Sequence, residues 1–272
     1  MLFLYTALLT ILVCLPNKTF CQLDNFPNGA RSSSLGNASV TLEDCYAVSN
    51  NIAGIASLNK ITIGSTFQNK FLLSNLYSGQ LIGTIPYKRI VVAFSLEHFG
   101  DQLYNEQNIS LGIAHQFSTI KIGLKTNYFQ VQGSDFQTRD GFIINFGGIV
   151  DLNKNLKFGT YLTNINQYKI KNGNTQIIIP LLFKLGLSYK PIDKIIVNAN
   201  ISKQSFNKPA THIGIEYAII KKLFVRSGIS TNPYAHFFGM GFHHLQFKMD
   251  YSITVLQPLG TSQQISISYF LN

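Results

Sequence analysis

Charged residues are scarce in this sequence: Asp, Glu, Lys and Arg make up 12% of its 272 residues, whereas an ordinary soluble domain has about 25%. So few charges cannot cover a surface that faces water on all sides. After the N-terminus there is also no apolar run of about 20 residues, which excludes membrane-spanning helices. Tyr (13), Phe (21) and Gly (21) are abundant. The other structure that crosses a membrane is a closed β-barrel, in which apolar and polar residues alternate. A soluble β-sandwich is the alternative.

Residues 1–21 are predicted to be a signal peptide. The stretch from Met1 to Leu15 is almost wholly apolar, Pro16 ends it, and the segment up to Cys21 fits a cleavage site. No Lys or Arg precedes the apolar run, which is unusual for a signal peptide. Lipidation of Cys21 is a second possibility. Cleavage after Cys21 leaves one thiol, Cys45, so no intramolecular disulfide is expected.

Signatures of catalysis, metal binding and nucleic-acid binding are missing. There is no G-x-S-x-G, H-E-x-x-H or Walker motif. His243 and His244 are adjacent, so on a strand they point to opposite faces and cannot bind one metal together. Basic residues occur singly or in pairs at turns, not in clusters on a helix. We therefore predict no enzyme activity, no cofactor, no metal and no nucleic-acid partner.

Apolar and polar residues alternate in segments of about ten residues from about residue 58 to residue 272. In one such segment Phe247, Met249 and Tyr251 alternate with Lys248 and Asp250. The count of segments predicts an all-β, transmembrane antiparallel β-barrel of about 14 strands, with twelve as the alternative. The predicted strands are 59–68, 77–86, 88–99, 105–117, 119–132, 140–151, 155–168, 176–190, 194–204, 209–219, 222–231, 235–243, 245–256 and 262–271.

The connections between these segments alternate between short and long. Short periplasmic turns and longer outer loops are typical of bacterial outer-membrane barrels. An even strand count then places both termini in the periplasm, with membrane lipid around the barrel. Basic residues gather at the short turns; they are Lys88, Arg89, Lys154, Lys190, Lys194, Lys221 and Lys222. They are interpreted either as solvated turn residues or as a basic rim that contacts lipid headgroups or an acidic partner.

Strand periodicity assigns one face of each strand to lipid and the other to the lumen. The residues expected to face lipid include Ile195, Val197, Phe247, Met249, Ile265 and Ile267. Tyr residues near strand ends suggest an aromatic girdle. Glu216 and Arg226 lie on consecutive strands, and the short turn between them places them opposite each other. The charged residues predicted to face the lumen are Lys121, Lys125, Glu216, Arg226, Lys248 and Asp250.

Residues 22–57 precede the barrel and do not alternate. In an open lumen, water would hydrate the inward-facing charges and weaken the pairs between them, whereas a segment that fills the lumen would exclude much of that water. We therefore predict that residues 22–57 fill the lumen as a plug, in part helical. Asp44 and Asn51 are candidates for holding it inside the barrel. They equally fit a local role as capping residues, Asp44 at the start of a short helix over 43–49.

This leading segment carries a motif of the form G-A-R-x-x-x-L-G, followed by an Asp and by N-x-A-G. It resembles the N-terminal motif of the PorV/PorQ-like branch of the FadL-type outer-membrane barrels. Ile52 and Ile55 stand where that family usually has Pro and Leu. The matching residues are Gly29, Ala30, Arg31, Gly36, Asp44, Asn51, Ala53 and Gly54.

The resemblance implies two classes of function. PorV- and PorQ-like proteins work with partner proteins of the type IX secretion system, which is our leading expectation. FadL-like relatives are passive transporters of small hydrophobic molecules, which is the alternative. A barrel hydrolase is a third, weaker possibility. The sequence does not identify a cargo, ligand or partner.

Overall fold

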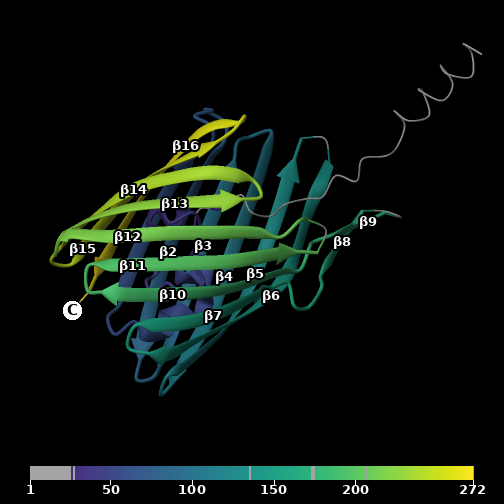
Figure 1. The fold of residues 1–272 in the computed structure, drawn as a ribbon. Helices are drawn as coiled ribbons and strands as arrows, with labels where there is room; N and C mark the ends of the chain where they lie inside the picture. Colours follow the sequence, from purple (N-terminus) through teal and green to yellow (C-terminus); the bar gives the residue numbers. More distant parts are fainter. Residues whose placement is uncertain (1–25, 27, 135, 173–174, 206, 272) are drawn as a thin grey trace, which may run out of the picture.

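The computed structural model describes residues 26, 28–134, 136–172, 175–205 and 207–271, so the predicted signal peptide lies outside the described residues. Fourteen strands form one closed antiparallel barrel, in which each strand pairs with the next barrel strand along the chain and β16 pairs with β1 (Figure 1). The predicted all-β barrel of fourteen strands is confirmed, and twelve strands are excluded. The barrel strands are β1 (Thr62–Asn69), β2 (Tyr77–Tyr87), β3 (Ile90–Gly100), β4 (Tyr104–Phe117), β5 (Ile120–Gly133), β6 (Phe136–Asn153), β7 (Leu156–Thr163), β10 (Leu182–Ile192), β11 (Ile195–Gln204), β12 (Ala210–Ile220), β13 (Leu223–Thr231), β14 (Tyr234–His244), β15 (Phe247–Leu256) and β16 (Gly260–Phe270).

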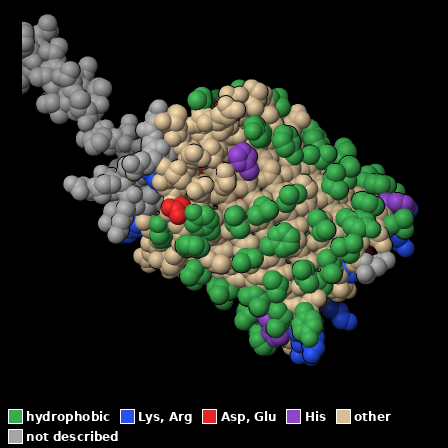
Figure 2. Space-filling view, turned by 180° about the vertical axis from the view of Figure 1, so that it is seen from behind, with side chains coloured by type: hydrophobic (Ala, Val, Ile, Leu, Met, Phe, Trp, Pro, Cys, Tyr) green, Lys and Arg blue, Asp and Glu red, His purple; other side chains and the backbone are tan. Residues whose placement is uncertain are grey.

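Alternation along the strands separates an apolar outer wall from a polar inner one. On β3, Phe94 is 44% exposed whereas its neighbour Ser95 is fully buried, because successive side chains point to opposite faces. Apolar side chains are spread over the face of the outer wall that Figure 2 shows. Of the residues predicted to face lipid, four are exposed and two are partly exposed on this wall; in that order they are Phe247, Met249, Ile265 and Ile267, then Ile195 and Val197.

The structure departs from the predicted strands between β7 and β10. The predicted strand 155–168 ends at Thr163, because Asn164 takes a left-handed φ of 57° and turns the chain. The predicted strand 176–190 begins at Leu182, since Pro180 has no N–H to offer a sheet. Between them β8 (Lys169–Asn172) and β9 (Thr175–Ile178) form a separate two-stranded sheet, which extends beyond the barrel rim (Figure 1).

The described residues before β1 lie inside the barrel, where the purple ribbon appears in Figure 1. They contain α2 (Ala30–Ser34), α3 (Ala47–Asn50) and the 3₁₀ helix η1 (Ile52–Ser57). Apolar side chains of this segment are buried, and five of them, Leu35, Val40, Val48, Ile52 and Ile55, have no exposed surface. We call residues 28–57 the plug.

The two ends of the barrel differ in their connections. Six hairpins at one end have two-residue turns, whereas the longest connections lie at the other end. The chain leaves the plug for β1 at the short-turn end, and the backbone N–H of Leu271 bonds to Ile61 there. Phe26, however, lies in the lumen on the long-loop side of the plug. Within the described residues, no helix is long and apolar enough to span a membrane.

Candidate functional site

Asn51 fastens the plug to the barrel wall. Its side-chain amide is fully buried and donates to the carbonyl oxygens of Gly148 on β6 and Thr160 on β7, both at 3.2 Å, and to Val40 within the plug at 2.7 Å. Its Oδ1 accepts from the backbone N–H of Ala53 and so caps η1. Asn51 therefore plays both of the roles considered for it.

Asp44 makes its bonds to other residues of the plug. Its Oδ1 accepts from the backbone N–H of Tyr46 at 3.0 Å, and its Oδ2 pairs with Nη1 of Arg31 at 3.2 Å. The local helix is shorter than the predicted 43–49, since α3 covers Ala47–Asn50 alone. Asp44 thus shapes the turn before α3 and orients Arg31.

Arg31 joins the plug to a chain of buried charges on the wall. Its Nε and Nη2 donate to the two carboxylate oxygens of Glu216, each at 2.8 Å. Glu216 also accepts from Arg226 Nε at 2.5 Å, and Arg226 Nη1 donates to Asp250 at 2.7 Å. Glu216 and Arg226 are cross-strand partners, as the strand numbering predicted. Burial lowers the pKa of Arg31, but the carboxylates of Glu216 and Asp44 raise it above its ordinary value, so Arg31 stays charged.

A second ionic cluster fixes the opposite side of the plug. Glu43 binds Lys121 on β5 and Lys157 on β7, and Lys121 also donates to Asp151 on β6 at 2.9 Å. Sequence reasoning placed Lys121 in the lumen but did not single out Glu43 or Lys157. The sequence feature that could have indicated Glu43 is its position next to Asp44 in an acidic pair. In the structure the two carboxylates point to different sides of the plug, Glu43 to Lys121 and Asp44 to Arg31.

Two predicted lumen charges, Lys248 and Lys125, take no part in these two clusters. Lys248 and Asp250 share the inner face, but Asp250 is bound by Arg226 and the Lys248 ammonium lies 4.7 Å from the Phe270 ring centre. Arg226 reaches Asp250 from β13 across β14, where Gly241 leaves room for the guanidinium: a Cβ there would lie 2.7 Å from Nη2 of Arg226. Lys125 lines the cavity described below.

Glycines on the inner wall let the plug approach the backbone of the barrel. A Cβ added at Gly214 on β12 would lie 2.3 Å from the carbonyl oxygen of Leu35, and one at Gly228 on β13 would lie 2.3 Å from the N of Gly36. The same holds on the far side, where a Cβ at Gly123 would lie 2.8 Å from a methyl carbon of Ile52. The plug is therefore seated at van der Waals contact.

The small residues of the N-terminal motif are explained by packing. Gly29 has φ 89° and lies against the ring of Tyr46, and Gly36 has φ 69°, a conformation that glycine adopts without strain. A Cβ at Gly54 would lie 2.3 Å from the carbonyl oxygen of Leu42. The remaining small motif residues, both fully buried, are Ala30 and Ala53.

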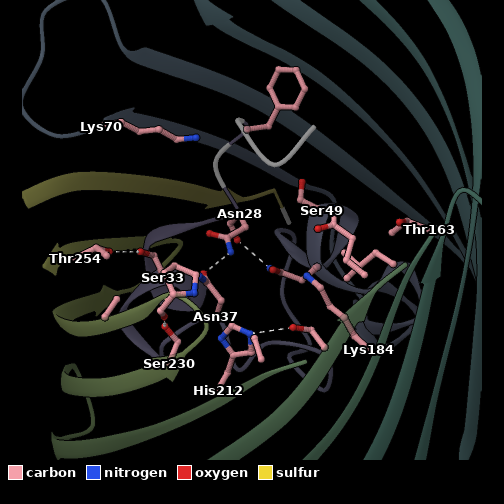
Figure 3. Close-up of a pocket in the computed structure, with 18 of the residues that line it drawn as sticks. Asn28, Ser33, Asn37, Ser49, Lys70, Thr163, Lys184, His212, Ser230 and Thr254 are labelled. Carbon is pink, nitrogen blue, oxygen red and sulfur yellow. Dashed lines mark hydrogen bonds between the residues drawn. The ribbon is translucent and has the colours of Figure 1, made fainter. Parts of the chain in front are cut away.

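Above the plug, on its long-loop side, the lumen holds a cavity of about 1430 Å³. Plug residues form its floor: Figure 3 shows Asn28, Ser33 and Asn37 beside His212 and Lys184 of the wall. The lining continues to the long connections at Lys70 and other loop residues. The labelled side chains are polar, but the full lining is mixed, because apolar side chains such as Phe71, Leu76 and Phe99 lie beside the polar ones.

An acidic side chain, Glu97 on β3, is held at the edge of this cavity by neutral groups. Gln80 and Asn108 donate to its carboxylate at 2.6 Å each, and Ser49 of the plug donates at 3.2 Å. These bonds keep the carboxylate buried without a cation bound directly to it. No group of three His, Cys, Asp or Glu within the described residues could hold a metal ion.

Comparison with known proteins was made by sequence and by structure. No protein-family model and no curated protein matches the sequence. Solved structures match along most of the chain. The toluene transporter TodX of Pseudomonas putida aligns with a TM-score of 0.67 at 12% identity, covering 89% of this chain and 97% of TodX. This chain therefore shares the barrel fold of that outer-membrane transporter.

Two further structures support the same fold. The toluene transporter TbuX of Ralstonia pickettii has a TM-score of 0.67 and 12% identity, covering 90% of this chain and 98% of TbuX. A FadL homologue of Pseudomonas aeruginosa has a TM-score of 0.62 and 12% identity, covering 88% of this chain and 97% of the homologue. These matches support the FadL-type part of the expected resemblance and give no support to its PorV/PorQ branch.

Proposed function

We propose that this protein is a plugged outer-membrane channel that admits small molecules from outside the cell. The observation that carries this proposal is the lumen itself: a cavity of about 1430 Å³ lies toward the long loops, with plug residues as its floor. A molecule that enters from the long-loop end meets the plug before it reaches the short-turn end. The plug is thus the gate.

The attachment of the plug suits a gate. Hydrogen bonds and ion pairs hold it to the wall, at Asn51, at Arg31 and at Glu43, together with an apolar core that plug and wall share. None of these contacts is a hydrogen bond between barrel strands, so release of the plug breaks no strand pairing. TodX and TbuX, which share the fold, are described as toluene transporters. That likeness favours passage of small molecules over protein secretion.

A role in type IX secretion is not proposed. The motif that suggested it consists of residues whose contacts lie inside the barrel, such as Arg31 with Glu216 and Gly36 with Ile229. Those contacts account for the motif through docking of the plug. We propose that the short turns and the C-terminus lie in the periplasm and the long loops outside the cell, as is usual in bacterial outer-membrane barrels.

The proposal is tested by measuring uptake into proteoliposomes that contain the purified protein. The solutes are toluene, glucose and glucuronate. At least one should enter faster than into protein-free liposomes, and no entry above that background for any of the three would argue against the channel. In planar bilayers the plugged protein should show no steady conductance on the nanosiemens scale.

A disulfide tests whether the plug is the gate. A Cβ at Gly64 on β1 would lie 3.0 Å from the Sγ of Cys45 in the plug, and the distance from a Cβ to the far sulfur of a disulfide is about 3 Å. The variant Gly64→Cys should therefore lock the plug when oxidised. Uptake should fall after oxidation and recover after reduction. Gly79→Cys is the control, because nothing lies within 4 Å of its Cβ position.

A further inference from the structure

The cavity above the plug is positively charged. Among the described residues that line it are four lysines and one carboxylate, Glu97, whose oxygens already accept four hydrogen bonds. A chamber for a hydrocarbon needs no such charges, and the burial of one of them, Lys125, is costly without a ligand or water. The lining therefore favours an anion. The four lysines are Lys70, Lys125, Lys184 and Lys208.

Lys125 on β5 is the most buried of these cations. It is 4% exposed, and within the described residues it makes no hydrogen bond or ion pair. Lys121, four residues earlier on the same strand and face, is equally buried but is bound by Glu43 and Asp151. A buried ammonium without a bound acceptor is expensive. Lys125 thus has donors available for a molecule in the cavity.

A second lysine extends the site along the wall. Lys184 on β10 is half-buried and also lines the cavity (Figure 3). Between the two lysines lie β6 and β7, which contribute Asn145, the cross-strand partner of Lys125, and Thr163. Two cations and two neutral hydrogen-bonding groups therefore follow one another across four adjacent strands.

Amide groups elsewhere in the lining lack partners. Gln264 on β16 is 2% exposed, and neither its Oε1 nor its Nε2 has a hydrogen-bond partner. The Oδ1 of Asn200 on β11 is likewise unpaired. Buried polar atoms in proteins are nearly always satisfied, so these atoms, which side chains of the lining cover, become partners for water or a polar ligand when those side chains move.

We propose that the cavity binds a small polar organic anion, whose carboxylate lies at Lys125 and Lys184 and whose hydroxyl or amide groups bond to the neutral lining. This inference rests on the proposed channel function and names its class of substrate. It differs from toluene, the compound that TodX and TbuX are described as transporting. The chemistry that selects the ligand is charge together with hydrogen bonding.

The test is calorimetric binding to the purified protein in detergent, with four probes that form two matched pairs. Glucuronate and glucose differ in the carboxylate, and benzoate and toluene differ in the same way on an apolar frame. Glucuronate should bind most tightly, and added salt should weaken its binding. Glucose binding as tightly as glucuronate would overturn the role of the charge, and benzoate or toluene binding as tightly would overturn the polar character of the site.

Charge-removing variants locate the site. Lys125→Met and Lys184→Met should each weaken glucuronate binding by about tenfold or more, the usual effect of losing a charge-assisted hydrogen bond. Lys222→Met, at a two-residue turn at the far end of the barrel, should leave it unchanged. Equal affinity in all three variants would overturn the assignment. If glucuronate binds but does not enter the liposomes, the channel is refuted and the binding site stands. If uptake is the same with and without both lysines, the channel stands and the binding site is refuted.

Discussion

Arg31 of the plug and Glu216 of β12 form a two-pronged ion pair, with both N–O distances at 2.8 Å. The planar guanidinium matches the two carboxylate oxygens, which a lysine could not do. The pair connects a segment that precedes the barrel to a strand 185 residues later. It is a direct link between the gate and the wall.

Breaking this pair from the wall side should loosen the plug. Glu216→Gln keeps the shape but leaves Arg31 and Arg226 without their shared carboxylate, and loss of one partner of a buried pair costs about 3–5 kcal/mol. Chemical unfolding in detergent measures the loss. Asp193→Asn is the control: its pair with Lys190 has Asp193 99% exposed, and such surface pairs contribute about 0–1 kcal/mol. Equal stability of the two variants would contradict the linking role of Glu216.

Filling the space at Gly214 should expel the plug while the barrel remains. In Gly214→Val the new side chain overlaps the carbonyl of Leu35, whereas Gly79→Val meets open space. Trypsin should then cut after Arg31 in the first variant and not in the second, which mass spectrometry of the fragments detects. Protection of Arg31 in both proteins would show that the plug does not depend on this contact.

The cost of arginine on the outer wall should depend on depth. Leu111 is 60% exposed at the middle of β4, so Leu111→Arg should destabilise the protein in lipid by about 2–4 kcal/mol. Met249 lies near the short-turn end of β15, so Met249→Arg should cost less. Gln204→Arg, which points into the cavity, serves as the lumen control. Unfolding in lipid vesicles gives the three values, and a uniform penalty would contradict the assigned faces.

Cys45 should be inert in the native protein. It is 3% exposed, and burial raises the pKa of its thiol, so the reactive thiolate is scarce. A maleimide should therefore leave the Cys45 peptide unmodified until the plug is released, for example in Gly214→Val. Leu245→Cys, at a turn residue that is 91% exposed, should be labelled at once. Rapid labelling of Cys45 in the native protein would show that the plug opens freely.

Local patterns were sufficient for the barrel. Alternation with a period of two defines the strands, because strand geometry itself has that period, and an offset of a few residues does not change the count. The pairing of Glu216 with Arg226 followed from the length of one turn. The extra sheet of β8 and β9 was missed, since Asn164 and Pro180 interrupt the strands through local geometry that alternation does not report.

The sequence by itself thus determined the fold class, the strand number and which faces are apolar. The tertiary structure decided how the lumen is organised. Lys121 and Lys125 share one face of one strand, yet their surroundings differ. Lys121 pairs with Glu43 of the plug, whereas Lys125 lies beyond the plug and lines the cavity. Similarly, Asp250 pairs with Arg226 across two strands and not with nearby Lys248. Such partners come from segments far apart in the chain, and their distances are fixed when the barrel closes around the plug.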